Sequence, residues 1–289
     1  MDYYCFPTET GDISVFSNLD QYKEYSNEKL FYELAYEDVV QAKEKGKLLL
    51  FDLKNKKFID DNKNIVDITG KEIFPRCKLS DSKKLLKAIE ENGGNSIVTK
   101  ADTKTVENWF EYIDVQRKFL RTTYGKVISN LDFYEEKYGN ELFLKTIKKQ
   151  FSKVCLIVSF GETKELFVRV GHSMLGGNMV IHDNSTPVIV TDALTIVEDD
   201  YGRREWRTFV VKGKILCISR ISDKVVEIEP YVTQKIEQRV EQISKISTFP
   251  SSYCVDFFEY KNNDETIFDI CEFNPIESSG KYQNNKLVF

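Results

Sequence analysis

The second half of the chain alternates between short apolar runs and polar turns. Residues 230–246 place apolar side chains at helical spacing, so we expect a helix there. The shorter apolar runs predict strands at 154–160, 165–170, 179–182, 188–190, 206–211 and 215–220. A sheet, a helix and a final hairpin are therefore expected after residue 153.

The first part of the chain shows a different order of elements. Residues 47–53 are rich in Leu and predict a short buried strand. A helix is expected from Leu79 to the pair Gly93–Gly94, followed by a strand at 96–98 and a second helix at 105–120. Strand, helix, glycine stop and strand is the βαβ order, so residues up to about 120 are predicted to form a small α/β unit.

The most informative segment is the last hairpin, in which the apolar runs 252–258 and 267–275 flank a polar turn. Side chains alternate between the two faces of a strand, so Glu272 and Asn274 share a face. Asp256 joins them if it pairs opposite Glu272. Carboxylate and amide oxygens suit Mg²⁺, which binds through one or two carboxylates plus substrate phosphates. The alternative is a solvent-facing strand, but the flanking aromatic residues favour a buried sheet, where unpaired carboxylates are costly.

Another hairpin is predicted around Lys212–Gly213. With a two-residue turn, Arg207 pairs with Ile218. Glu205 then pairs with Arg220, and all four side chains share one face. Two guanidinium groups would lie beside a carboxylate, and the planar fork of arginine suits phosphate oxygens. An ordinary surface salt bridge is the alternative, and a three-residue turn would break this register.

These two hairpins resemble the ATP-grasp superfamily. Val-Asp-Phe-Phe, a polar turn and Glu-x-Asn-Pro are similar to its metal-binding end, which implies that Asp256, Glu272 and Asn274 hold Mg²⁺ ions at the ATP phosphates. Glu-Trp-Arg followed by Ile-Ser-Arg is similar to one divergent clade, named for an Arg and two Lys residues. That clade contains a eukaryotic assembly chaperone for translation initiation factor two, and phage and bacterial proteins of unassigned substrate. The resemblance covers about residues 150–282.

The resemblance also implies a nucleotide site with basic side chains at the phosphates. A loop with two glycines would cover the phosphates, although a glycine pair is also common in tight turns. Residues 188–194 would form the hinge that contacts adenine. The implied catalytic cations are Arg169, Arg207 and Arg220. The implied nucleotide contacts are Arg169, Arg207, Gly176, Gly177, Val190 and Asp192.

The fold implied is an α+β ATP-grasp domain at 121–289, with two α+β subdomains around a nucleotide cleft, preceded by a small α/β pre-grasp unit at 1–120. The activity implied is that of an Mg²⁺-dependent ligase, which activates a carboxylate as an acyl phosphate with ATP and joins it to an amine. The acceptor would be an unidentified peptide or protein. Two alternatives stay open: a MgATP-dependent assembly chaperone or binding module without turnover, and a phosphotransferase acting on a hydroxyl or a nucleic-acid end.

Composition narrows these alternatives. The 289 residues are 41% hydrophobic and 30% charged, which is typical of a soluble globular protein. The formal net charge of −5 argues against a general nucleic-acid binder. No long apolar run and no signal-peptide pattern is present, so no membrane segment is expected. The six cysteines are scattered without C-x-x-C spacing, which favours reduced thiols and a cytoplasmic protein.

Overall fold

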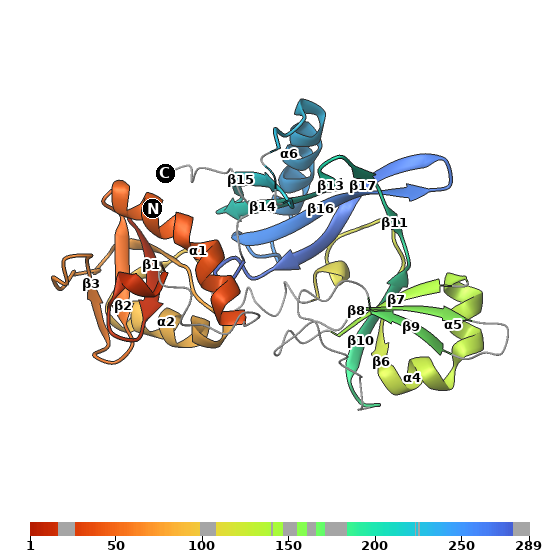
Figure 1. Ribbon diagram of the computed structural model, residues 1–289, viewed down its shortest axis with the longest axis horizontal. Helices are drawn as coiled ribbons and strands as arrows, with labels where there is room; N and C mark the ends of the chain where they lie inside the picture. Colours follow the sequence, from red (N-terminus) through yellow and green to blue (C-terminus); the bar gives the residue numbers. More distant parts are fainter. Residues whose placement is uncertain are drawn as a thin grey trace. The chain divides into compact units, whose positions relative to one another are not determined.

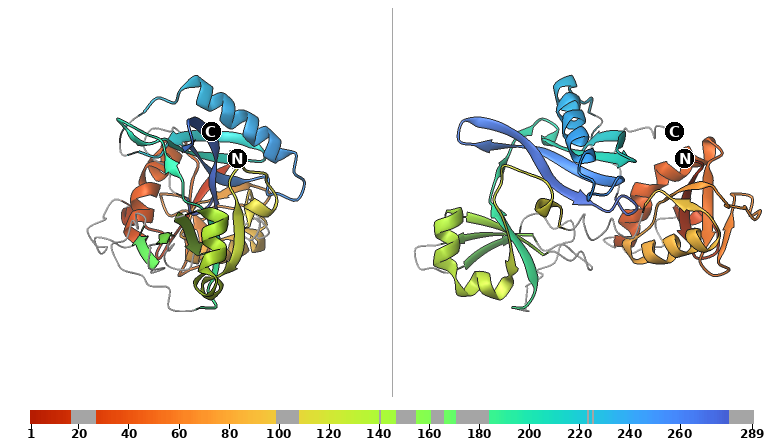
Figure 2. Two further views of the ribbon diagram at one scale, coloured as in Figure 1. Left: turned by 90° about the vertical axis from the view of Figure 1, so that its right-hand side faces the viewer. Right: turned by 180° about the vertical axis from the view of Figure 1, so that it is seen from behind.

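The computed structural model divides into two units by its contacts (Figures 1 and 2). Unit 1 comprises Met1–Tyr112, Glu198–Glu259 and Ile270–Phe289, and unit 2 comprises Ile113–Val197 and Tyr260–Asp269. This division differs from the sequence-based boundary near residue 120, because the C-terminal sheet shares a core with the N-terminal one. The structure describes residues 1–16, 27–98, 108–139, 141–146, 155–160, 166–170, 184–222, 224 and 226–279.

The first sheet belongs to unit 1 and has the strand order β3-β2-β1-β4-β5. Strand β1 is parallel to β2 and β4, β4 is parallel to β5, and β3 is antiparallel to β2. The elements are β1 (Tyr3–Thr8), the 3-10 helix η1 (Ile13–Phe16), α1 (Asn27–Glu44), β2 (Leu48–Asp52), β3 (Lys57–Ile59), β4 (Glu72–Pro75), α2 (Leu79–Glu91) and β5 (Asn95–Ser96).

Apolar side chains cover both faces of this sheet. On one face Tyr4 and Leu50 pack in a cluster with Val39 of α1. On the other face Cys5 and Leu49 pack with residues of α2. A sheet covered on both sides needs continuous apolar strands, and every residue of β2 is buried. The predicted strand at 47–53, the helix starting at Leu79 and the α/β character of this region are therefore confirmed.

The predicted helix at 105–120 is wrong for the part of it that the structure describes. Trp109–Glu111 form the 3-10 helix η3, and Phe119–Thr123 form strand β6. Trp109 is buried, with its ring centroid 5.4 Å from that of Phe273. Strand β6 pairs with a neighbouring strand, so tertiary packing outweighs the helical spacing of the apolar residues.

Unit 2 contains an antiparallel sheet with the order β6-β10-β7-β8-β9. A cluster around Val188, Val190 and Tyr134 forms its core. The predicted strands at 154–160, 165–170 and 188–190 are confirmed, and the one predicted at 179–182 lies outside the described residues. The remaining elements are α4 (Tyr124–Ser129), α5 (Leu131–Tyr138), β7 (Glu141–Thr146), β8 (Cys155–Phe160), β9 (Leu166–Val170), β10 (Pro187–Asp192) and β11 (Thr195–Ile196).

The third sheet has the order β11-β16-β14-β15, with β17 also paired to β16. The two long strands of the final hairpin and helix α6 are seen in Figure 1 and, from behind, in Figure 2. The hairpin and the helix were both predicted from the sequence. The four apolar residues at helical spacing in α6 are all buried. The strands of the third sheet after β11 are β14 (Glu205–Val211), β15 (Lys214–Arg220), β16 (Tyr253–Asn262) and β17 (Glu265–Asn274), and helix α6 spans Pro230–Ser244. Strands β12 (Glu198–Asp199) and β13 (Gly202–Arg203) form a separate two-stranded sheet.

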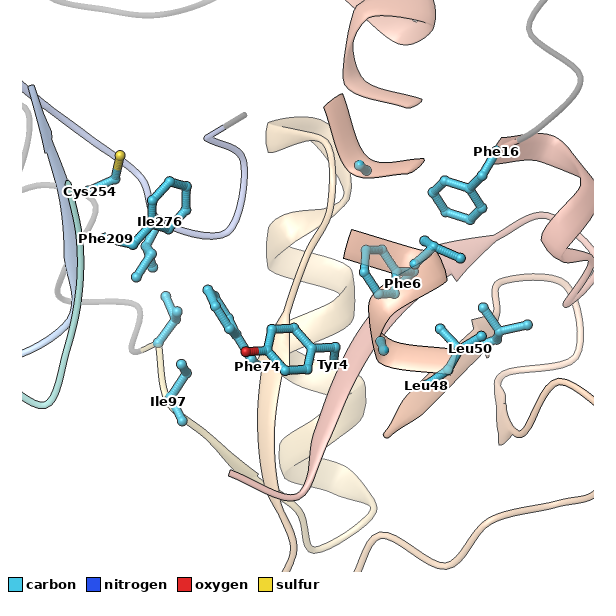
Figure 3. Close-up of a cluster of buried hydrophobic side chains, with 14 of the residues drawn as sticks. Tyr4, Phe6, Phe16, Leu48, Leu50, Phe74, Ile97, Phe209, Cys254 and Ile276 are labelled. Carbon is cyan, nitrogen blue, oxygen red and sulfur yellow. The ribbon is translucent and has the colours of Figure 1, made fainter. Parts of the chain in front are cut away.

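One hydrophobic cluster joins the first and third sheets within unit 1. Figure 3 shows Phe209, Cys254 and Ile276 from the C-terminal part facing Tyr4 and Phe74 from the N-terminal part. All five side chains are at most 2% exposed. The third sheet is therefore packed against the first sheet and its helices, through the face that also carries Arg207 and Asp256.

Within the residues that the structure describes, no helix combines the length and the apolar character that a bilayer crossing requires. Cys5, Cys77, Cys217, Cys254 and Cys271 are all free thiols.

Candidate metal centre

The centre of the third sheet carries a buried arginine–carboxylate pair. Arg207 on β14 lies directly opposite Asp256 on β16. Arg207 donates from Nε to Asp256 Oδ1 and from Nη2 to Asp256 Oδ2, both at 2.7 Å. The two side chains are only 12% and 6% exposed. This bidentate fork fixes the plane of the Asp256 carboxylate.

Strand β17 adds an amide and a second carboxylate to the same face. Asn274 Nδ2 donates to Asp256 Oδ2 at 2.9 Å and to Glu272 Oε1 at 3.1 Å. One nitrogen atom therefore lies within hydrogen-bonding distance of oxygens from both carboxylates. The sequence brought Asp256, Glu272 and Asn274 together as a prediction, and the structure places their side chains in contact.

Glu205 is a further carboxylate of this face, which the sequence placed beside Arg207 as a partner of Arg220 and not among the metal ligands. It lies two residues before Arg207 on β14, so both side chains point to the same side of the sheet. Burial raises the pKa of Glu205, and the negative charges of Asp256 and Glu272 raise it further, while Arg203 and Arg207 act in the opposite direction. Alternation along β14 already put Glu205 beside Arg207, and the pairing of β14 with β16 brings both to the face of Asp256.

The donor chemistry of this cluster fits Mg²⁺. Glu205, Asp256 and Glu272 give three carboxylates, against the guanidinium of Arg207. In the described part of the chain, no group of three His, Cys, Asp or Glu side chains is arranged to hold an ion by itself. A site made of two carboxylates and the Asn274 amide depends on further oxygens, as Mg²⁺ sites that use substrate phosphates do.

The predicted pairing of Arg207 with Ile218 and of Glu205 with Arg220 is wrong. Arg207 pairs with Ser219, and Arg220 lies opposite Trp206. The turn has the expected two residues, Lys212 and Gly213, both with positive φ. A β-bulge between Phe209 and Val210 then shifts the register by one residue. Because a shift of one residue reverses the faces, Arg220 lies on the opposite side of the sheet from Arg207.

Arg220 belongs to a second charged cluster on that opposite face. It donates from Nη2 to Asp199 Oδ1 at 2.9 Å and from Nε to the carbonyl of Arg203 at 3.0 Å. Its guanidinium carbon lies 5.2 Å from the centre of the Trp206 ring. The side chain is only 2% exposed. Arg220 is therefore enclosed by protein groups.

Arg204 joins this second cluster at the start of β14. It donates from Nε to Glu259 Oε2 at 2.6 Å, and from Nη1 to Glu229 Oε1 at 2.8 Å and to Asp199 Oδ2 at 3.1 Å. Burial alone would raise the pKa of Asp199. Hydrogen bonds from the Tyr201 amide and from the Arg220 and Arg204 guanidinium groups outweigh burial and lower that pKa. The ionised form of Asp199 is thus stabilised by the chain itself.

The other predicted nucleotide contacts belong to unit 2 or fall outside the described residues. Arg169 lies in β9, where its backbone pairs with Ile157 of β8. Gly176 and Gly177 are outside the described residues. These three assignments stay predictions.

The predicted adenine hinge begins inside strand β10. Val190 is fully buried and pairs with Leu120 on one side and Leu144 on the other, so its backbone is part of the sheet. Asp192 ends the strand, and its Oδ2 accepts a hydrogen bond from the Lys118 amide at 2.9 Å. Residues 188–192 are therefore paired within the sheet. The rest of the predicted hinge, residues 193–194, follows the strand.

Several solved structures are similar to this chain. The D-alanyl-alanine synthetase A from Vibrio cholerae O1 biovar eltor has 13% sequence identity and a TM-score of 0.50, over 96% of this chain and 91% of that one. A RimK domain ATP-grasp protein from Sphaerobacter thermophilus has 10% identity and a TM-score of 0.47, over 95% and 91%. The ATP-grasp ligase PsnB, in complex with a phosphomimetic variant of a minimal precursor, Mg and ADP, has 12% identity and a TM-score of 0.49, over 96% and 89%.

The likeness to the synthetase extends over nearly the whole chain and concerns the fold. The predicted α+β ATP-grasp fold is confirmed. No protein-family model matches the chain, and no curated protein sequence matches it. Membership of the divergent clade stays a prediction.

Proposed function

We propose that this chain is an Mg²⁺-dependent ligase that uses ATP to activate a carboxylate as an acyl phosphate and joins it to an amine. One observation carries the proposal: Asp256 and Glu272 meet at the amide of Asn274, and Glu205 lies close enough to be affected by both charges. The fold supports it, because the similar structure from Vibrio cholerae is by name a synthetase of alanyl-alanine.

Asp256, Glu272 and Asn274 are the proposed Mg²⁺ ligands. A divalent ion bound to them would neutralise the charge of the nucleotide phosphates and of the transferred phosphoryl group. Arg207 orients Asp256 through its two hydrogen bonds and keeps a fixed positive charge at the same place. Glu205 adds negative charge beside them, which strengthens the attraction for a cation.

Arg169 is proposed to contact the phosphates, and Gly176 and Gly177 are proposed to cover them. Adenine would be contacted by backbone groups after Asp192, since Val190 is paired on both sides and Asp192 is still paired on one. We leave Arg220 out of the phosphate contacts because Asp199, Arg203 and Trp206 enclose it.

The amine-bearing acceptor is proposed to be a peptide or a protein, and the reaction is proposed to take place in the cytoplasm. In the chemistry proposed, a carboxylate oxygen attacks the γ-phosphorus of ATP, and ADP leaves. The amine nitrogen then attacks the acyl carbon, and inorganic phosphate leaves with loss of one proton from nitrogen. A ligase should therefore release ADP and phosphate in proportion to the amide formed.

Thermal-shift and trapping experiments test this proposal. ATP with Mg²⁺ should raise the melting temperature of the wild type, EDTA should remove the rise, and Glu272→Gln should reduce it strongly. Glu241→Gln is the matched control, because Glu241 is an exposed residue of α6 that pairs with Lys245. Hydroxylamine should then trap an activated carboxylate from a panel of acids.

The outcomes separate the alternatives. Equal stabilisation by ATP with and without EDTA would contradict the metal assignment. Metal-dependent ATP binding without hydroxamate, together with nucleotide-dependent binding of a protein partner, would favour the binding module. Transfer of phosphate to a hydroxyl or a nucleic-acid end would favour the phosphotransferase.

A further inference from the structure

A fully buried arginine contacts the chain just beyond the proposed metal ligands. Arg76 follows β4 and is 1% exposed. It donates from Nη1 to the carbonyl of Ile276 at 2.8 Å. Ile276 lies two residues after Asn274, so this hydrogen bond fixes the backbone directly after the end of β17.

The opposite edge of the Arg76 guanidinium is held by a carboxylate of helix α1. Nε and Nη2 of Arg76 lie 3.1 and 2.9 Å from Asp38 Oδ2. The side chain of Asp38 is 2% exposed. A planar guanidinium can reach a carboxylate and a carbonyl on two different sides at fixed angles, whereas the ammonium of a lysine cannot reproduce that geometry.

Aromatic side chains enclose this arginine. The guanidinium carbon lies 5.7 Å from the ring centre of Phe74 and 5.4 Å from that of Phe209. Figure 3 shows these two rings on the N-terminal and C-terminal sides of the shared core, with Ile276 beside Phe209. Arg76 therefore connects α1, β4, β14 and the segment after β17.

A second set of bonds ties the same segment to the N-terminal layer. The amide of Cys77 donates to the carbonyl of Glu277 at 2.8 Å. Ser82 Oγ donates to Glu277 Oε1 at 2.9 Å, and Glu277 is 1% exposed. Residues 276–277 are thus bonded to the β4–α2 connection through both backbone and side chains.

We infer that Arg76, held by Asp38, is a positioning residue for the proposed metal centre: it fixes the end of β17 and so the place of Asn274 relative to Asp256. This inference rests on the proposed function. A buried ion pair often adds little stability over an apolar pair of similar volume, so its effect here lies in geometry. Residues that support metal ligands from behind set the affinity of a site without touching the ion.

The test compares metal affinity at matched stability. The double variant Asp38→Leu with Arg76→Met removes both charges and keeps an apolar core. Val39→Ala is the matched control, because it creates a cavity in the same core on the same helix without a polar link to residues 276–277. Mn²⁺ is titrated in the presence of ATP, and water-proton relaxation enhancement reports protein-bound Mn²⁺ without any turnover.

The double variant should bind Mn²⁺ about tenfold more weakly than the wild type, the range typical of lost support behind a metal ligand. Val39→Ala should keep the wild-type affinity although it melts at a lower temperature. Ser82→Ala, which removes only the bond to Glu277, should also weaken Mn²⁺ binding, and it provides the test if the double variant does not fold.

Two results would overturn the inference in different ways. Wild-type Mn²⁺ affinity in Ser82→Ala and in a folded double variant would overturn the positioning role alone and leave the metal centre standing. No relaxation enhancement in the wild type itself would overturn the metal centre, and the positioning role with it.

Discussion

The two faces of the third sheet carry similar groups but treat their carboxylates in opposite ways. On the face of Trp206, Arg204 and Arg220 donate to Asp199, and the pKa of Asp199 is lowered. On the face of Arg207, burial and the charges of its neighbours raise the pKa of Glu205. The cluster on the face of Trp206 therefore stabilises the ionised form of Asp199 with arginines of the chain itself.

The cluster on the face of Arg207 brings three carboxylates, those of Glu205, Asp256 and Glu272, close together. Arg207 is fully engaged with Asp256, and the Asn274 amide contributes no net charge between Asp256 and Glu272. A divalent cation would lower the energy of this arrangement, whereas a further cation on the other face would compete with two arginines. The contrast supports the proposal that the metal site lies on the face of Arg207 and that Arg220 has a structural role.

The largest effect is expected from breaking the Arg207–Asp256 pair. Asp256→Leu leaves a guanidinium that is 12% exposed without its carboxylate, which should cost about 3–5 kcal/mol of unfolding free energy. Urea unfolding followed by circular dichroism measures this loss. The double variant with Arg207→Met should recover most of the stability but show no metal-dependent ATP binding. A single variant as stable as the wild type would show that the pair is not buried as described.

A smaller loss is expected on the other face. Arg220→Met removes the donor to Asp199 and to the Arg203 carbonyl, which should cost about 1–3 kcal/mol. The rise in melting temperature with ATP and Mg²⁺ should stay as large as in the wild type. Loss of that rise in a folded Arg220→Met protein would return Arg220 to the nucleotide site and remove the distinction between the faces.

The smallest effect concerns the pH dependence of stability. A carboxyl group whose pKa is raised by folding stabilises the protein fully below its unfolded pKa, and this contribution is lost as pH rises through the folded pKa. The raised pKa of Glu205 therefore predicts that Glu205→Gln gains stability relative to the wild type as pH rises from about 4 towards neutral. Urea midpoints measured across that range check the sign, and a difference independent of pH would contradict it.

The spacing of apolar residues predicted the helices and strands well, because it reflects which face of each element is buried. The helical spacing of Val232, Ile236, Val240 and Ile243 gave helix α6, and two apolar runs around a polar turn gave the last hairpin. The helix expected at 105–120 failed, since pairing of Phe119–Thr123 within the unit 2 sheet outweighs local propensity.

The candidate site was predicted only where it lies within one hairpin. Glu272 and Asn274 share a face by simple alternation, whereas the Arg207–Asp256 pair needs the sheet order that makes β14 and β16 neighbours. One bulged residue moved Arg220 to the other face, and nothing local in the sequence marks that bulge. The contact of Arg76 with Ile276 spans 200 residues, beyond the reach of any local pattern.

The central claim is that a divalent ion binds with ATP on the face of Arg207. Crystals grown with Mn²⁺ and ATP, measured at a wavelength where manganese scatters anomalously, test it most directly. We predict an anomalous peak in contact with Asp256 and Glu272, with nucleotide phosphates completing its ligands, and no such peak beside Arg220 and Asp199. Bound ATP without a peak at Asp256 and Glu272, or a peak at Asp199 instead, would contradict the account.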